Sequence, residues 1–273
     1  MKRLFILLIT LTAVLPSCGS NPGSAKVSFT TEELWLQNGS NRIFGLLYRP
    51  DGVEKAPLVV ISHGFGGSHQ FGKAYAEALA PMGCAVYCYD FCGGSNVSRS
   101  DGETTRMSIF SEAGDLKAVI DGLCSQDGID GAHVTLIGES QGGMVSALVA
   151  ADSPSDIDRL ILIYPALCIK DDWVKMYPAL SDMPEEVDFW GMKLGHAYLE
   201  GLYDLDVYRN ISRYEGPVAI FHGDRDQVVN LSYSERAKEA YKKATLTVLP
   251  GEGHGFSPDA QARVIKAVQD LLK

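Results

Sequence analysis

The sequence predicts an α/β fold in which a mostly parallel sheet is covered by helices on both faces. Short apolar strands and helical segments alternate along the chain, which is typical of repeated strand and helix units. Two later strands run directly into polar clusters, and open α/β sheets place their sites just past strand ends. A chain of 273 residues, 46% of them hydrophobic, can bury the core of one such domain.

The expected elements begin with an antiparallel hairpin over residues 32–50, which turns at Asn38-Gly39-Ser40-Asn41. An apolar strand at 57–62 follows. Further strands are expected at 133–137, 217–221 and 244–249, and helical periodicity is found at 72–82, 111–126, 143–150, 232–244 and 258–273.

The pentapeptide Gly138-Glu139-Ser140-Gln141-Gly142 lies between the 133–137 strand and the 143–150 helix. Strand, tight turn and helix are the setting of a nucleophile elbow. There the glycines permit close packing, and the serine takes a strained backbone conformation beside a helix N-terminus. Many matches to G-x-S-x-G are ordinary turns, so Ser140 is a candidate nucleophile that needs partners elsewhere in the chain.

A serine hydroxyl needs a base to remove its proton and a carboxylate to orient that base. In this architecture the acid and then the histidine follow the serine along the chain. His254 lies between two glycines after the 244–249 strand and is the candidate base; the alternative is a loop histidine that caps the next helix. Asp224 and Asp226 both follow the 217–221 strand. The spelling H-G-x-x-D-x-V-V favours Asp226 as the acid and leaves Asp224 to stabilise the turn.

Acyl transfer also needs two donors for the oxyanion. The backbone N–H of Gln141, directly after Ser140, is the expected first donor. The second is expected from Phe65 in the sequence His63-Gly64-Phe65-Gly66-Gly67, which follows the 57–62 strand. Glycines in this loop would let the backbone approach a ligand closely.

These motifs resemble the α/β-hydrolase family and, within it, the bacterial feruloyl (cinnamoyl) esterases. The resemblance runs from about residue 34 to the C-terminus. The matching segments are H-G-F-G-G, the Tyr89-Asp90-Phe91 strand end with Ser98-Arg99-Ser100-Asp101-Gly102, G-E-S-Q-G-G, the Tyr164-Pro165-Ala166 strand end, H-G-D-R-D-Q-V-V and the terminal G-H-G-F.

The resemblance implies an α/β-hydrolase fold with an inserted cap and a serine carboxylic ester hydrolase that works through an acyl-enzyme. The implied substrates are hydroxycinnamoyl (feruloyl-type) esters of plant polysaccharide. An acetyl or short-chain acyl esterase, a serine peptidase and a non-catalytic binding lipoprotein are the alternatives. Two positions depart from the family pattern. Glu139 stands where such esterases commonly carry His, and we expect it to point away from the attacking face. The sequence of residues Cys92–Val97 is unusual for the corresponding loop of the family.

The connection between the strands ending near Ala166 and starting at Pro217 is far longer than the usual few residues, so residues 167–213 are expected to form the cap. The segment is rich in aromatic and acidic residues. It could be a pair of lid helices without ligand contacts, or the wall of a slot for a planar phenolic acyl group. The resemblance places Asp172 at the polar end of that slot; otherwise Asp171 or Asp172 caps a helix beginning near Trp173.

The N-terminal segment predicts export. Lys2 and Arg3 precede an apolar run of signal-peptide length, so residues 1–17 are expected to be a signal peptide. The segment ending at Cys18 resembles a bacterial lipobox, which makes Cys18 the lipidation site; ordinary cleavage without lipid is the alternative. Residues 18–33 would then be a tether and residues 34–273 the enzyme domain, on a periplasmic or outer-membrane lipoprotein of a Gram-negative bacterium.

The composition limits the classes of molecule that are expected to bind the protein. The formal charge is −10 and no basic cluster is found, so nucleic acid is not expected as a partner. The remaining histidines are expected to be loop or core residues, and neither a metal nor a cofactor is required. The five cysteines after Cys18 are expected to be buried thiols, although a single disulfide is conceivable. Expected partners are a small-molecule or polysaccharide-linked ester and, through the lipid anchor only, a membrane; a homodimer is left open.

Overall fold

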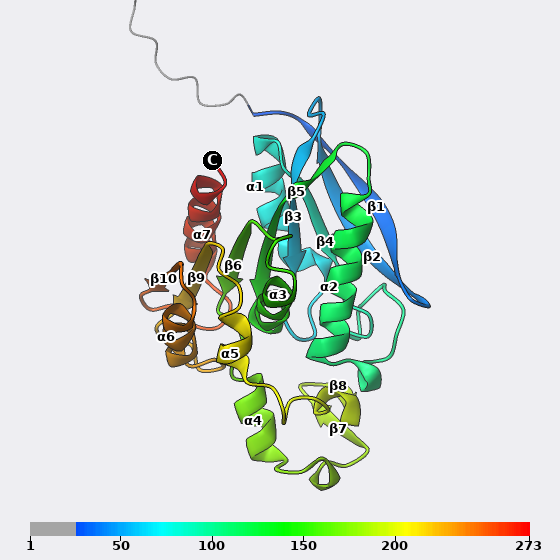
Figure 1. The fold of residues 1–273 in the computed structure, drawn as a ribbon, viewed down its shortest axis with the longest axis vertical. Coiled ribbons are helices and arrows are strands. Elements are labelled where there is room, and N and C mark those ends of the chain that lie inside the picture. Colours follow the sequence, from blue (N-terminus) through cyan, green and yellow to red (C-terminus); the bar gives the residue numbers. More distant parts are fainter. Residues whose placement is uncertain (1–25) are drawn as a thin grey trace, which may run out of the picture.

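The computed structural model describes residues 26–273. The expected signal peptide and Cys18 therefore lie outside the described residues. The main body is a sheet of eight strands in the order β1-β2-β4-β3-β5-β6-β9-β10, with helices on both faces (Figure 1). This arrangement confirms the predicted fold class.

The chain enters the sheet through the predicted hairpin. Strands β1 (Phe29–Asn38) and β2 (Asn41–Pro50) pair antiparallel, and Gly39 at the turn has a φ of 56°. Strand β2 also pairs antiparallel with β4. All later pairings in this sheet are parallel, and the strands are β3 (Ala56–Ser62), β4 (Ala85–Tyr89), β5 (Ile129–Glu139), β6 (Arg159–Ile163), β9 (Val218–Gly223) and β10 (Ala244–Leu249).

Each face of the sheet has its own apolar core. Helices α1 (Lys73–Leu79) and α7 (Pro258–Leu271) cover one face, where Tyr75 and Val264 are fully buried. The other face carries α2 (Ile109–Cys124), α3 (Ser140–Asp152), α5 (Val207–Ile211) and α6 (Leu231–Ala240). Central strands are buried on both sides, which explains their continuous apolar runs.

Capping explains where two helices begin. Ser108 and Ser111 form a reciprocal capping box, so α2 starts at Ile109, two residues before its predicted start. Ser257 accepts from the Ala260 N–H and Pro258 occupies the first turn of α7. The predicted helix over 232–244 was too long at its end: α6 stops at Ala240 because the next residue is extended and β10 begins soon after.

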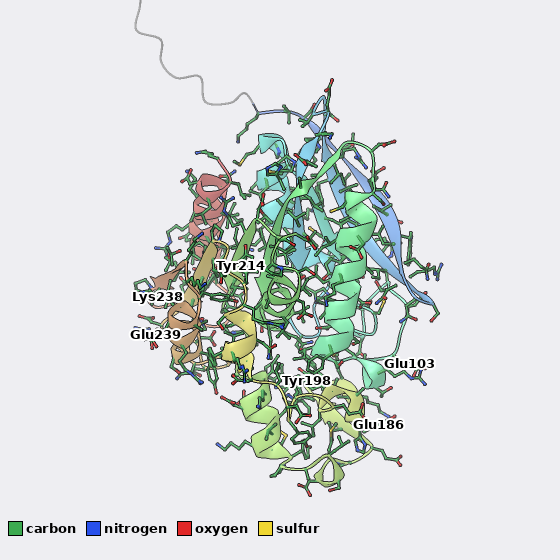
Figure 2. The ribbon with its side chains drawn as sticks, in the orientation of Figure 1. Glu103, Glu186, Tyr198, Tyr214, Lys238 and Glu239 are labelled. Carbon is green, nitrogen blue, oxygen red and sulfur yellow. The ribbon has the colours of Figure 1, made fainter. Side chains whose placement is uncertain are left out.

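The segment between β6 and β9 forms a cap at one end of the molecule (Figure 1). It contains α4 (Ile169–Met176) and a two-stranded hairpin of β7 (Glu186–Phe189) and β8 (Met192–Gly195), before α5 returns the chain to the main body. The hairpin was not expected. Figure 2 shows Tyr198 at the junction of the cap and the body.

The cysteines in the described part of the chain are free thiols: Cys84, Cys88, Cys92 and Cys168 are buried as expected, whereas Cys124 is only half-buried. Between residues 26 and 273 no cluster of side chains is suited to a metal ion. The same residues contain no helix that is long and apolar enough to span a bilayer.

Candidate active site

Ser140 lies at the sharp turn from β5 into α3. Its φ is 48°, a left-handed value that is uncommon for a residue with a side chain and marks the strained elbow. The flanking glycines are required by close packing. A Cβ on Gly138 would lie 2.4 Å from the Gly142 carbonyl oxygen, and one on Gly142 would lie 2.4 Å from the His63 carbonyl oxygen.

The fold brings Ser140, at the start of α3, together with Asp226 and His254, which lie in the loops after β9 and β10. His254 Nε2 lies 3.0 Å from Ser140 Oγ, and His254 Nδ1 lies 2.7 Å from Asp226 Oδ2. Since a carboxylate only accepts, the imidazole proton is on Nδ1, and Nε2 is free to accept the serine proton. The side chain of Asp226 is fully buried, whereas that of His254 is 19% exposed.

The two candidate aspartates have different partners. Burial acts to raise the pKa of Asp226, but hydrogen bonds from His222 and His254 outweigh it and hold the pKa well below its usual range. Asp224 instead accepts from the backbone N–H of Gly251 at 2.6 Å, so it fixes one loop against another. Only Asp226 contacts His254 among the two.

The glycine-rich loop after β3 passes close to the nucleophile. A Cβ on Gly64 would lie 3.1 Å from Ser140 Cβ, so the backbone of this loop is in contact with the elbow. Phe65 and Gln141, the two expected oxyanion donors, line one cavity together with Ser140.

His63 holds this loop in place, a role that the sequence did not reveal. Its Nδ1–H donates to the Gly64 carbonyl at 2.7 Å, and its Nε2 accepts from the Phe91 N–H at 3.2 Å. Burial lowers the pKa of His63, which favours the neutral ring that this pairing needs.

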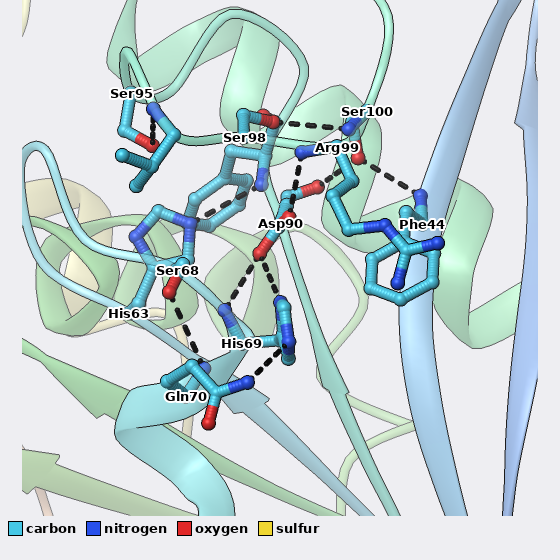
Figure 3. A network of polar contacts seen from close by, with 12 residues as sticks. Phe44, His63, Ser68, His69, Gln70, Asp90, Ser95, Ser98, Arg99 and Ser100 are labelled. Carbon is cyan, nitrogen blue, oxygen red and sulfur yellow. Dashed lines mark hydrogen bonds and ion pairs between the residues drawn. The ribbon is translucent and has the colours of Figure 1, made fainter.

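A second polar network, centred on Asp90, lies beside His63 (Figure 3). The buried carboxylate of Asp90 accepts from the backbone N–H groups of His69 at 2.6 Å and Arg99 at 2.8 Å, and from His69 Nδ1 at 2.8 Å. His63 thus lies in the loop and His69 begins a short 3-10 helix, and the ring of each has a partner within the protein.

The cavity at Ser140 has a volume of about 240 Å³ and aromatic walls. The ring of Trp173 lies 5.0 Å from that of Phe189 and 4.6 Å from that of Tyr198, between ring centroids. Phe65 meets the Phe189 ring edge-on at 5.5 Å. The residues that line the cavity are Phe65, Ser140, Gln141, Ala166, Cys168, Ile169, Asp172, Trp173, Met176, Phe189, Trp190, Tyr198, Gln227, Val228 and Val229.

Asp172 lies in the wall of this cavity, on helix α4. The alternative prediction, that Asp171 or Asp172 is the N-cap of this helix, is wrong. Helix α4 begins at Ile169 with Cys168 as its N-cap, so both aspartates lie inside the helix. Asp171 instead accepts from the Tyr233 hydroxyl at 3.1 Å. Burial, and then a hydrogen bond with Asp172, raise the pKa of the Cys168 thiol, so the Asp172 end of the cavity is polar but holds no thiolate.

Comparison with known proteins gives the family. A family model described as serine aminopeptidase S33 (Hydrolase_4) matches residues 54–197, more than half of the chain. The chain is an α/β-hydrolase. Human monoacylglycerol lipase ABHD6 is 22% identical to this hydrolase over 267 residues, which cover 79% of the chain and 75% of the lipase. The uncharacterized protein Rv2307c of Mycobacterium tuberculosis is 26% identical over 255 residues, which cover 92% of this chain and 82% of Rv2307c.

Among solved structures, the hydrolase resembles Est1E from Butyrivibrio proteoclasticus with ferulic acid bound. The TM-score is 0.78 at 27% sequence identity, over 88% of this chain and 97% of Est1E. The DcsB complex with its substrate analogue has a TM-score of 0.75 at 19% identity, a likeness of fold alone, over 88% of this chain and 98% of DcsB.

The hydrolase contains a buried polar network at the elbow that no sequence motif indicates. The Gln141 side chain donates from Nε2 to Glu112 Oε2 at 2.8 Å and accepts at Oε1 from the Tyr198 hydroxyl at 2.5 Å. All three residues are buried. Burial raises the pKa of Glu112 well above its ordinary value. The network joins α2, the elbow and the cap.

Glu139, the departure from the family pattern, lies behind the histidine. Its carboxylate accepts from the Tyr164 hydroxyl at 2.7 Å, and the Tyr164 ring packs 4.6 Å from the His254 ring. Glu139 is not among the residues that line the cavity, as expected. Burial raises the pKa of Glu139, and the hydrogen bond from Tyr164 opposes this shift.

Proposed function

We propose that this hydrolase is a serine carboxylic ester hydrolase that acts through an acyl-enzyme on hydroxycinnamoyl (feruloyl-type) esters of plant polysaccharide. The observation that carries the proposal is the chain of contacts from Asp226 through His254 to Ser140, at the wall of a cavity of about 240 Å³ with aromatic sides. Nucleophile, base and orienting acid within hydrogen-bond reach are the signature of an activated serine.

In acylation, His254 Nε2 takes the proton of the Ser140 hydroxyl while Oγ attacks the ester carbonyl carbon. The carbonyl oxygen becomes an oxyanion, which the backbone N–H groups of Phe65 and Gln141 stabilise. Asp226 stabilises the imidazolium that forms. The tetrahedral intermediate then collapses, the bond to the alcohol oxygen breaks, and His254 returns the proton to that oxygen.

In deacylation, a water molecule takes the place of the alcohol. His254 removes one of its protons, the hydroxide attacks the acyl carbon, and the second tetrahedral intermediate uses the same oxyanion donors. Collapse breaks the bond to Ser140 Oγ, which regains its proton from His254. The free acid leaves and the enzyme returns to its starting state.

The shape and chemistry of the cavity support a phenolic acyl group. Its walls include Trp173, Phe189 and Tyr198, which offer planar apolar surface for an aromatic ring. Asp172 provides a carboxylate to accept a hydrogen bond from a phenol hydroxyl. The structural likeness to Est1E, which was solved with ferulic acid bound, agrees with this substrate class.

A substrate panel tests the proposal. The purified chain is assayed on methyl ferulate, methyl caffeate, p-nitrophenyl acyl esters, acetylated xylan and aminoacyl anilides, beside Ser140→Ala. We expect the highest kcat/KM on the hydroxycinnamates and a loss of several orders of magnitude in Ser140→Ala. A fluorophosphonate probe should label Ser140. Faster hydrolysis of the aminoacyl anilides would favour a peptidase, and faster hydrolysis of acetyl esters a short-chain esterase.

We also propose that the protein is exported and anchored by lipid on Cys18. The apolar run that ends at Ser17 and Cys18 supports this proposal. In cells that express the full chain, the wild type should partition into detergent and incorporate labelled fatty acid. Cys18→Ala should do neither. If both proteins stay in the aqueous periplasmic extract, the anchor proposal is wrong.

A further inference from the structure

Four nitrogen atoms lie within 3.2 Å of the carboxylate of Asp226. Oδ1 accepts from the backbone N–H groups of Val228 at 2.8 Å and Val229 at 2.9 Å. Oδ2 lies 2.7 Å from His254 Nδ1 and 3.2 Å from His222 Nε2. Two imidazoles therefore share one carboxylate oxygen, and only one of them contacts Ser140.

The proton position on His222 follows from its neighbours. Nε2 faces two groups that only accept, Asp226 Oδ2 and the Val229 carbonyl oxygen at 2.9 Å, so Nε2 carries a proton. On the other side of the ring, Nδ1 lies 2.7 Å from the hydroxyl of Ser234 on α6. In the neutral ring that hydroxyl donates to Nδ1.

His222 is placed rigidly at the end of β9. The side chains of His222 and Ser234 are fully buried. In contrast, an aspartate side chain has a broad torsional preference at its last bond, so the orientation of a carboxylate depends on its donors. Removing one of two donors to Oδ2 would let the carboxylate turn and would alter its charge as seen by His254.

We propose that His222 is a positioning residue of the active site, which donates from Nε2 to Asp226 Oδ2 and thereby fixes the carboxylate that orients His254. This inference rests on the proposed serine-hydrolase function. The proposed line of contacts runs from Ser234 through His222, Asp226 and His254 to Ser140. The low pKa of Asp226 agrees with the extra donor, because hydrogen bonds to a carboxylate favour its charged form.

Two amide substitutions separate this role from core packing. The side-chain nitrogen of Gln reaches about as far as Nε2 of histidine, and that of Asn about as far as Nδ1. His222→Gln should therefore keep a donor to Asp226, whereas His222→Asn should keep only the contact with Ser234. Ile220→Val is the matched control, because Ile220 is buried on the same face of the same strand and makes no polar contact with the triad.

The readouts are kcat and KM on the best ester of the panel, and the rate of Ser140 labelling by a fluorophosphonate, each measured well below the Tm of each variant. In His222→Asn we expect kcat and the labelling rate to fall roughly 10-fold to 100-fold, with little change in KM. His222→Gln should recover most of that loss, and Ile220→Val should match the wild type.

The pH dependence of kcat/KM distinguishes the two roles, because a change in core packing alone would not shift it. With fewer donors on Asp226, the charge of its carboxylate attracts the imidazolium more strongly, so the acid limb of kcat/KM in His222→Asn should shift to higher pH. The other titratable groups near His254, Glu139 and Tyr164, are unchanged in every variant.

An unchanged rate and acid limb in His222→Asn would overturn the role of His222, and so would an equal loss in His222→Gln. A wild-type chain that hydrolyses no ester and does not react with the probe at Ser140 would overturn the serine-hydrolase assignment itself. The two failures are therefore distinguishable.

Discussion

The hydroxyl of Tyr198 in the cap donates to the side chain of Gln141, the residue directly after Ser140, at 2.5 Å. The backbone N–H of Gln141 is also the proposed oxyanion donor. One residue therefore connects the cap, which lines the cavity at Ser140, to the proposed oxyanion donor. Its side chain also donates to the buried carboxyl group of Glu112.

Tyr198→Phe should reduce kcat about 5-fold to 30-fold, because the buried Oε1 atom of Gln141 loses its donor at a cost of roughly 1–2 kcal/mol. The change leaves the aromatic wall in place, so KM for aromatic esters should change less than kcat. The matched control is Tyr203→Phe, which removes another cap hydroxyl, one that donates to the Tyr177 carbonyl. Equal effects of the two variants would contradict a role for Tyr198 at the oxyanion site.

Glu112→Gln should stabilise the protein increasingly as pH rises. Burial raises the pKa of Glu112 above its ordinary value of 4.5, so its contribution to stability is fully present below pH 4.5 and is lost as pH rises toward the folded-state pKa. Glutamine removes this titration and keeps an acceptor for Gln141. The difference in Tm between variant and wild type should grow from pH 4.5 to pH 8.

The exposed Glu103 supplies the control for that measurement. Glu103→Gln should change Tm little across the same range, since the carboxyl group is 76% exposed. A Tm difference for Glu112→Gln that is constant with pH would contradict a raised pKa in the folded state.

Asp226→Asn should lower kcat by several orders of magnitude, because the amide cannot hold His254 in the tautomer that accepts the serine proton. Asp224→Asn should lower kcat far less and should act mainly on stability, through its contact with the Gly251 N–H. Steady-state kinetics and thermal denaturation of the two variants check this. The reverse order of effects would reassign the acid.

Asp172→Ala should lower kcat/KM for hydroxycinnamoyl esters about 10-fold to 100-fold, because a hydrogen bond to a charged group contributes roughly 1.5–3 kcal/mol. Short aliphatic esters, which do not extend to Asp172, should be hydrolysed as before. Asp171→Ala is the control, because this neighbour contacts Tyr233 and does not line the cavity. Equal losses on both ester classes would remove Asp172 from substrate recognition.

Much of the fold and the candidate triad could be predicted because the signals are local. Alternating strands and helices follow from periodicity, and the elbow at Ser140 follows from glycines beside a strand end. The order of Ser140, Asp226 and His254 along the chain is itself a sequence property. Because parallel strands place their carboxyl ends at one edge of the sheet, this order was enough to expect the three side chains to meet.

The contacts that surround the triad were decided by tertiary structure. Tyr198 and Gln141 are 57 residues apart, and Glu112 and Gln141 are 29 residues apart, on elements whose periodicity does not encode the pairing. The cap hairpin has strands of four residues, too short to give a clear alternation.

Short-range spacing in the sequence is enough to predict the fold class, the elbow and the residue types of the candidate triad. The tertiary structure decided that His222 shares Asp226 with His254, and that α4 begins at Ile169, which places Asp172 within the helix. Both outcomes depend on how buried polar groups find partners across separate elements. That pairing is set by the packing of the apolar core around them, which no local pattern specifies.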